Sequence, residues 1–232
     1  MNPRERHQAT MRFAVPDRVP FNPGGGREST RRRWHAEGLP SEIENGNEIA
    51  AYAYKQAGGT LELPVSGKGF PLLERMIPEF EEKIIERRER TLVVQDWKGN
   101  ICEISDEFDT RHLRNAIDFV TRRWIKCPVE TRDDWEQMKK RYDSSAAERL
   151  GEHPEGLASE LAGRDYPVGF NFSGPFWQLR EWLGFENLCM AFYDDPVLVQ
   201  DMIEFWTEHV ATLLQRGLRH MVPDWVHISE DM

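Results

Sequence analysis

Hydrophobic and polar residues alternate most clearly in the last third of the chain. Val168, Phe170 and Phe172 recur at every second position, the period of a strand with one buried face. From Pro196 onward, hydrophobic residues recur every third or fourth position and predict a long helix; they are Val199, Ile203, Trp206, Val210 and Leu214. A second strand is expected over residues 224–229. Because a helical excursion separates the two strands, we expect them to pair in parallel, as in a βαβ unit.

The rest of the chain predicts more strands and helices. Two further strands of the parallel type are expected near residues 18–22 and 60–65. Thr131, followed three residues later by Asp134, predicts the start of a helix with a capping box. Other helices are expected over residues 2–13, 29–38, 47–59, 78–90 and 173–184, and within 144–163.

One segment has the pattern of an antiparallel hairpin. Hydrophobic residues over 92–94 face those over 101–104, and Gly99 lies in the expected turn between them. Strands that alternate with helices, apart from this hairpin, place the chain in the α/β class. The hairpin is then an insertion in a mainly parallel architecture.

Composition and charge narrow the classes of partner. The 232 residues include 40 acidic and 30 basic side chains, a net charge of −10, which disfavours non-specific binding of nucleic acid. No stretch approaches the ~18 apolar residues of a membrane span. Cys102, Cys127 and Cys189 lie far apart, without the spacing of a disulfide framework or of a complete zinc site. We therefore expect a cytoplasmic protein that binds neither nucleic acid nor a membrane.

The first expected strand ends next to a glycine-rich turn. Parallel sheets bind ligands at the carboxyl ends of their strands. Here Gly25 and Gly26 precede Arg27 and the start of a helix. Glycine lets the backbone approach an anion closely, the helix N-terminus supplies N–H groups, and Arg27 adds positive charge. The turn is a candidate site for a substrate carboxylate or phosphate, and a plain flexible turn is the alternative interpretation.

Polar residues also follow the third and fourth expected strands. Asn171 and Ser173 are candidate substrate-binding residues, with simple helix capping by Ser173 as the alternative. Glu230 and Asp231 follow the last strand and are candidate catalytic carboxylates. Since neighbouring residues of a strand point to opposite faces, a pair acting together in acid–base chemistry is disfavoured. One of them acting alone, as a ligand or an orienting group, fits the pattern better.

Four stretches together resemble the uroporphyrinogen decarboxylase superfamily. They are, in family order, "RERHQATMRFAVPDRVPF", "VGFNFSGPFWQLREWLG", "DDPVLVQDMIEFWTEHV" and "DWVHISEDM". This superfamily comprises decarboxylases of tetrapyrrole biosynthesis and corrinoid-linked methyltransferases, all distorted (β/α)8 barrels of the TIM type. The resemblance implies that residues 1–232 belong to a single domain of this kind.

The sequence departs from the decarboxylases at three of their chemical positions. Their arginine-bearing motif after the first strand is represented here only by Arg27. Their aspartate after the second strand has no counterpart in "LELPVSGKG". Their tyrosine in the helix after the third strand is replaced by Glu181 or Trp182, which makes Glu181 a further catalytic candidate. The resemblance therefore implies a methyltransferase-type member acting with a corrinoid more than a uroporphyrinogen decarboxylase.

The resemblance also implies the cofactors and the rival functions. The methyltransferases use zinc, held by ligands in the second half of the barrel, to activate a thiol for methyl transfer. We therefore expect no metal ligands within this chain, with zinc and a corrinoid as cofactors of a complete protein. The expected partner is a tetrapyrrole, a corrinoid or a corrinoid protein. The alternatives are cofactor-free decarboxylation of tetrapyrrole acetate side chains, with Arg27 as the substrate anchor, and a non-catalytic tetrapyrrole- or corrinoid-binding protein.

Chain length suggests that only part of the barrel is present. A TIM barrel spends ~31 residues on each of its eight βα units. The 232 residues here are spread over about four units, so we expect the N-terminal part of a longer barrel. Half a barrel leaves open strand edges, which a homodimer would cover.

Overall fold

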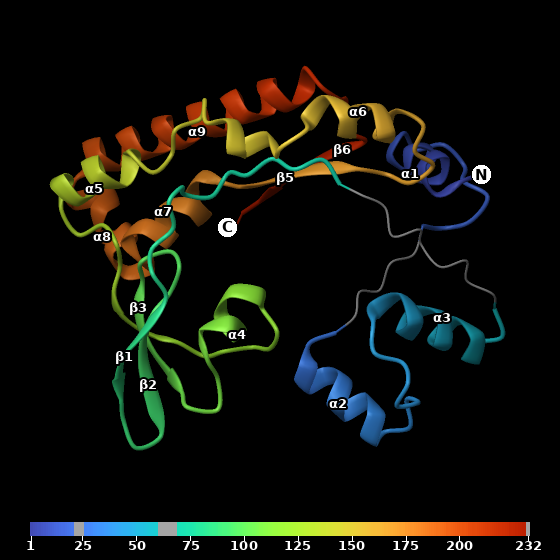
Figure 1. Cartoon of the computed structure of the whole chain (residues 1–232), viewed down its shortest axis with the longest axis horizontal. Helices are drawn as coiled ribbons and strands as arrows, with labels where there is room; N and C mark the ends of the chain where they lie inside the picture. The colour runs from blue at the N-terminus through green and yellow to red at the C-terminus, as the bar shows by residue number, and fades with distance from the viewer. Residues whose placement is uncertain (21–25, 60–68, 231–232) are drawn as a thin grey trace. The chain divides into compact units, whose positions relative to one another are not determined.

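The computed structural model describes residues 1–20, 26–59 and 69–230. The chain forms two compact units. The first comprises Met1–Lys68, Asn115–Phe119 and Gly163–Pro167, and the second comprises Gly69–Arg114, Val120–Ala162 and Val168–Met232. Within the described residues, the second unit holds all the strands, which are drawn as arrows in Figure 1.

The described part of the first unit contains three helices: α1 (Pro3–Met11), α2 (Glu28–Ala36) and α3 (Gly46–Gln56). The predicted helices are confirmed, but two begin earlier than expected. α3 starts at Gly46 because Asn45 and Glu48 form a capping box. A strand was expected near residues 18–22. For the described residues of this stretch the prediction is wrong, because Val19 and Pro20 lie in irregular backbone. Residues 21–25 and the strand expected at 60–65 lie outside the described residues.

An antiparallel sheet forms one part of the second unit, with strands in the order β1 (Lys83–Arg87), β2 (Thr91–Gln95), β3 (Ile101–Ser105) and β4 (Arg123–Lys126). The predicted hairpin is confirmed as β2 and β3, which pair from Thr91↔Ser105 to Gln95↔Ile101. The helix expected over 78–90 is wrong, because β1 lies within it and pairs with β2. Its charged residues suit a helix locally, but pairing along the free edge of β2 overrides that weak preference.

The parallel part of the second unit is built around β5 (Gly169–Ser173) and β6 (Trp225–Ser229). These strands pair in parallel from Gly169↔Trp225 to Ser173↔Ser229, as predicted. The connection between them contains three helices, α7 (Pro175–Leu183), α8 (Phe185–Asp194) and α9 (Pro196–Leu218). The remaining helices are α4 (Thr110–Asn115), α5 (Arg132–Lys139), the short 3-10 turn η1 (Ala147–Leu150) and α6 (Pro154–Ala162).

These elements give a mixed α/β fold with one four-stranded antiparallel sheet and one parallel pair within the described residues. The mixture of helices and strands is therefore confirmed, but the mainly parallel architecture is not, because the predicted hairpin belongs to a four-stranded antiparallel sheet and only β5 and β6 pair in parallel in the described part of the chain. In this part of the chain, no helix has the length and apolar character needed to cross a membrane.

The main hydrophobic core lies between α5, α7, α8 and α9. Trp135, Tyr142, Trp182 and Trp206 pack in it at ring distances of 4.9–5.8 Å. The Thr131–Asp134 capping box of α5 forms as predicted. On α9 the buried stripe is displaced from the predicted one, since Met202, His209 and Leu213 are more deeply buried than Ile203, Val210 and Leu214. The displacement brings a histidine, rather than a valine, into the core.

A segment without regular secondary structure, residues 69–77, runs beside β5 (Figure 1). Its Phe70 ring lies 6.1 Å from that of Phe170. The guanidinium of Arg149, which has no exposed surface, donates to the carbonyl groups of Leu73 and Arg75 at 2.7 and 2.8 Å. The same guanidinium also donates to the carbonyl groups of Asp143 and Arg141. Arg149 thus fastens the segment to the body of the unit.

Replacing this arginine should destabilise the second unit. In Arg149→Leu, four carbonyl groups lose the hydrogen bond from this guanidinium inside the protein, so we expect the free energy of unfolding to fall by about 3 kcal/mol in denaturant titrations. Arg123, which is 76% exposed and pairs with Glu103 at 3.1 Å, provides the control. Arg123→Ala should change stability by less than about 1 kcal/mol. Equal effects of the two substitutions would contradict the structural role given to Arg149.

Candidate functional site

The carboxyl ends of β5 and β6 lie side by side and meet the start of α7. Ser173 ends β5 and pairs in register with Ser229 at the end of β6. Gly174 donates its N–H to the carbonyl of Ser229 at 2.6 Å, and Pro175 begins α7. Trp206 of α9 donates its indole N–H to the carbonyl of Ser173 at 2.8 Å. Strand ends and a helix N-terminus therefore converge at one place, as the sequence predicts.

Glu230 occupies the N-terminus of α7. Its carboxylate accepts the backbone N–H of Phe176 at 2.7 Å, a position where a negative charge is favoured by the helix dipole. A Cβ atom on Gly174 would collide with this carboxylate, so a larger residue there would require the Glu230 side chain to move. The structure thus gives Glu230 a capping role at the predicted site. Asp231, the other predicted carboxylate, lies outside the described residues.

A carboxylate that the sequence did not single out, Glu74, lies against the end of β5. It accepts the backbone N–H of Ser173 at 2.8 and 3.0 Å and the hydroxyl of Ser173 at 2.8 Å. Burial raises the pKa of Glu74 above its ordinary value, although the hydrogen bonds from Ser173 and the charge of Lys98 act in the opposite direction. A carboxyl group of this kind can exchange a proton nearer to neutral pH than an exposed one.

Glu74 and Ser173 line a small cavity of about 70 Å³. The other residues around it are Arg75, Met76, Trp97, Lys98, Tyr142, Trp177, Gln178, Glu181 and Trp182. Glu181 and Ser173, both predicted site residues, are therefore brought together here. Lys98 Nζ lies 2.7 Å from Glu181 Oε2, and a guanidinium nitrogen of Arg180 lies 3.9 Å from the other oxygen.

The back of the cavity is aromatic and held by hydrogen bonds. The indole N–H of Trp182 donates to the Tyr142 hydroxyl oxygen at 3.1 Å, and the Gln178 amide lies 3.5 Å from the same oxygen. Burial raises the pKa of Tyr142, so its hydroxyl stays protonated. At the rim, Lys98 Nζ lies 5.0 Å from the centroid of the Trp97 ring.

His209 holds the backbone of Glu74 from the opposite side. Its Nε2 lies 3.0 Å from the carbonyl oxygen of Glu74, and its Nδ1 lies 2.7 Å from Ser144 Oγ. Because a carbonyl can only accept, Nε2 carries the proton and Nδ1 accepts from the Ser144 hydroxyl. Burial lowers the pKa of His209 to about 4, so the ring is neutral at pH 7. His209 is therefore a positioning residue for Glu74.

Asn171, a predicted substrate-binding residue, lies outside this cavity. It is exposed on β5 and pairs in register with His227 of β6. Because side chains alternate along a strand, Asn171 and Ser173 share one face, while Phe170 and Phe172 are buried on the other. Asn171 and His227 form an open polar surface on the same face as the strand-end serines.

The predicted anion cradle at the start of α2 already contains an internal carboxylate. The backbone N–H of Ser29 donates to Asp118 at 2.9 Å and its hydroxyl donates at 2.7 Å. Gly26 has the left-handed φ of +67° that suits glycine, and packs closely on Trp34. The guanidinium of Arg27 lies 4.9 Å from the Phe119 ring centroid. Substrate binding by Arg27 and Gly26 stays a prediction, and Gly25 lies outside the described residues.

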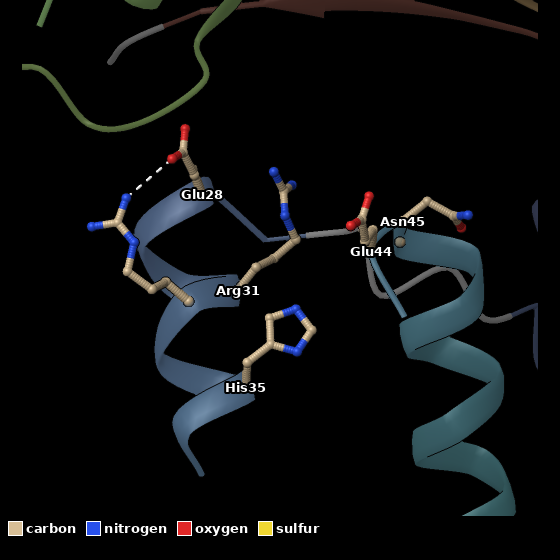
Figure 2. A pocket seen from close by; sticks show the side chains of 7 residues that line it. Glu28, Arg31, His35, Glu44 and Asn45 are labelled. Carbon is tan, nitrogen blue, oxygen red and sulfur yellow. Dashed lines mark hydrogen bonds and ion pairs between the residues drawn. The ribbon is translucent and has the colours of Figure 1, made fainter. Parts of the chain in front are cut away.

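The first unit has an open groove of its own between α2 and the start of α3 (Figure 2). Arg31 and His35 extend from α2 towards Glu44 and Asn45, and the cavity volume is about 690 Å³. The charges here are mixed, since Glu28 pairs with Arg32 at 3.0 Å and Glu44 also lines the groove. Arg31 donates to the carbonyl of Gly26 at 3.1 Å. The groove therefore has no clear preference for an anion or a cation.

The described residues do not provide a zinc site. They contain no group of three or more His, Cys, Asp or Glu side chains placed to hold a metal ion. Burial raises the pKa of both Cys102 and Cys127 to about 11, so these thiols are protonated at neutral pH and are poor zinc ligands. Cys189 is exposed on α8.

Comparisons with known proteins identify no relative. No protein-family model, no curated protein and no solved structure matches the chain. The geometry of the site is thus the main basis for a functional proposal.

Glu74, Lys98 and His209 complete the site and were not predicted from the sequence. Glu74 interrupts an apolar stretch, Leu72–Leu73 before it and Met76–Ile77 after it, which is a signal for a buried carboxylate. His209 falls on the helical stripe three residues after Trp206, which is a signal for a core histidine. Lys98 lies in a hairpin turn, and only the tertiary fold brings it to Glu181.

The neutral state of buried His209 predicts a pH-dependent stability. As its folded pKa of about 4 lies below the ordinary 6.5, the unfolded chain takes up the proton first on acidification. This stabilisation is complete above pH 6.5 and is lost between pH 6.5 and 4. Between pH 7 and 4.5, we expect the wild type to lose about 2 kcal/mol more unfolding free energy than His209→Gln.

Denaturant titrations at the two pH values would measure this difference. The control is His153→Gln, a substitution of an exposed histidine in the same unit, which should lose as much stability as the wild type. An equal pH dependence of the wild type and His209→Gln would show that His209 is not held neutral.

Proposed function

We propose that the chain is part of a distorted (β/α)8 barrel of the uroporphyrinogen decarboxylase superfamily, of the type that transfers methyl groups with a corrinoid. The observation that carries this proposal is the convergence of polar groups at the carboxyl ends of β5 and β6. Ser173, Ser229 and Glu230 lie there at the N-terminus of α7, where a parallel barrel places its active site.

The two faces of the β5–β6 pair support a barrel. One face carries Phe170 and Phe172, which are buried, in register with Val226 and Ile228, which are 45% and 59% exposed. The other face carries polar residues, including Asn171. In a barrel the first face packs against the outer helices and the second faces the axis. A further helix over β6 would cover its two exposed hydrophobic side chains.

The charges around the strand ends favour methyl transfer over porphyrinogen decarboxylation. Decarboxylation would require cations to bind the carboxylates of a tetrapyrrole. Here Glu74, Glu181 and Glu230 surround the strand ends. The lining cations are already paired, Lys98 with Glu181 at 2.7 Å and Arg75 with Glu79 at 3.3 Å. Such a site suits a neutral or cationic methyl donor better than a polyanion.

Each group of this chain has a definite role in the proposal. Ser173 orients the carboxyl group of Glu74, and the raised pKa of Glu74 suits it to exchange a proton with a bound substrate.

The cofactors would come from outside the described residues. A bound corrinoid would supply the cobalt that carries the methyl group. The free cysteines fit a reducing cytosol. The described part of the chain supplies no zinc site. In this proposal, the ligands of a zinc ion that activates a thiol would therefore come from residues outside that part.

Two assays separate the proposal from its rivals. Titration with cobinamide, followed by tryptophan fluorescence, should show saturable binding, and incubation with uroporphyrinogen should yield no coproporphyrinogen. His227→Ala, on the axis-facing side of β6, should weaken cobinamide binding by about tenfold, while His153→Ala should not.

Coproporphyrinogen formation would establish the decarboxylase alternative instead. Tight cobinamide binding without turnover of any methyl donor in a completed barrel would favour the non-catalytic binding protein. No binding of cobinamide would contradict the proposal itself.

A further inference from the structure

The small cavity at the end of β5 combines aromatic walls with a carboxylate, that of Glu74, for which the described part of the chain shows no direct ion pair. Glu181 has two cations near it, Lys98 and Arg180. Among the described residues, Glu74 forms no ion pair: its hydrogen bonds come from the N–H and hydroxyl of Ser173, and the charge of Lys98, which binds Glu181, acts on it only from a distance. A partly buried carboxylate is stabilised by hydrogen bonds, but an adjacent cation would stabilise its ionised form further.

The walls of the cavity suit a cation as well. Tyr142 and Trp182 form its back, and Trp177 lies at the start of α7. The protein already uses this chemistry at the rim, where Lys98 lies over the Trp97 ring at 5.0 Å and binds Glu181. Aromatic faces together with carboxylates are the usual surroundings of bound ammonium groups.

The size and charge of the cavity restrict the ligand further. A volume of about 70 Å³ exceeds what a single water needs and admits a molecule of a few non-hydrogen atoms. The carboxylates of Glu74 and Glu181 disfavour an anion, because the lining cations Lys98 and Arg75 are already paired with Glu181 and Glu79, and a neutral alcohol would bring no positive charge into contact with Glu74. A small amine in its ammonium form supplies both N–H donors and positive charge.

We propose that this cavity binds a small ammonium cation, a primary or methylated amine, beside the carboxylate of Glu74. This inference rests on the proposed function only in assigning the amine as the methyl donor. The binding itself requires neither a corrinoid nor methyl transfer, so the two can fail separately.

Methylammonium chloride is the probe, added to the full chain at constant ionic strength without any corrinoid. Its binding is followed through the indole N–H signals of Trp177 and Trp182 in NMR spectra. We expect saturable shifts with a dissociation constant in the millimolar range, the limit for a ligand of two non-hydrogen atoms. Methanol, a neutral molecule of equal size, and acetate, an anion, should bind at least about tenfold more weakly.

Two matched variants test the role of Glu74. Glu74→Gln should weaken methylammonium binding by at least about tenfold, whereas Glu155→Gln, which changes an 80% exposed carboxylate on α6, should bind like the wild type. If Glu74→Gln does not fold, the comparison of the three ligands on the wild type still decides. The proposal is overturned if methanol or acetate binds as well as methylammonium, if Glu74→Gln binds normally, or if no indole signal shifts up to about 100 mM.

Discussion

A guanidinium without exposed surface, that of Arg149, joins the carbonyl groups of Leu73 and Arg75 to those of Arg141 and Asp143. Burying this charge is favourable only because several carbonyl oxygens surround it. The segment over 69–77 has no ladder of its own, so these bonds replace the pairing that a strand would have. The position of the segment beside β5, and of every side chain it carries, depends on them.

Glu74 is the side chain for which this position matters most. Arg149 fixes the residues on either side of it, His209 binds its carbonyl oxygen, and Ser173 binds its carboxylate. A network in which each member is hydrogen-bonded is rigid, and rigidity lets a carboxyl group keep a raised pKa next to an aromatic cavity. The same contacts place a carboxyl group at the strand ends of β5 and β6, and the proposed preference for a cationic methyl donor rests on this placement.

The elements predicted correctly from the sequence are those that depend on local residue patterns and on the order of strands and helices along the chain. The parallel pairing of β5 with β6 follows from hydrophobic periodicity and the long α9 between them, and the α5 capping box follows from Thr131 and Asp134. Of the predicted site residues, Ser173 and Glu181 line the cavity at the end of β5, and Glu230 caps α7 beside it. The expected acid–base and anchoring roles of Glu230 and Arg27 stay untested.

Contacts between distant segments could not be predicted in this way. β1 was expected to be helical because its charges fit a helix, whereas its pairing with β2 depends on the completed sheet. Glu74 meets Ser173 across 99 positions of sequence, and no spacing rule relates them. Likewise, Asp118 fills the N-terminus of α2 from 89 residues away, where the sequence suggested a ligand.

The central claim is that Glu74 is a partly buried carboxyl group of raised pKa in a site that binds a cation. A ¹³C NMR titration of the glutamate side-chain carboxyl groups, with the Glu74 signal assigned by its loss in Glu74→Gln, tests both parts of this claim. The account predicts a pKa above the ordinary value in the free protein, since burial disfavours the charged form, and a lower pKa when methylammonium is present. An ordinary pKa that methylammonium does not change would contradict it.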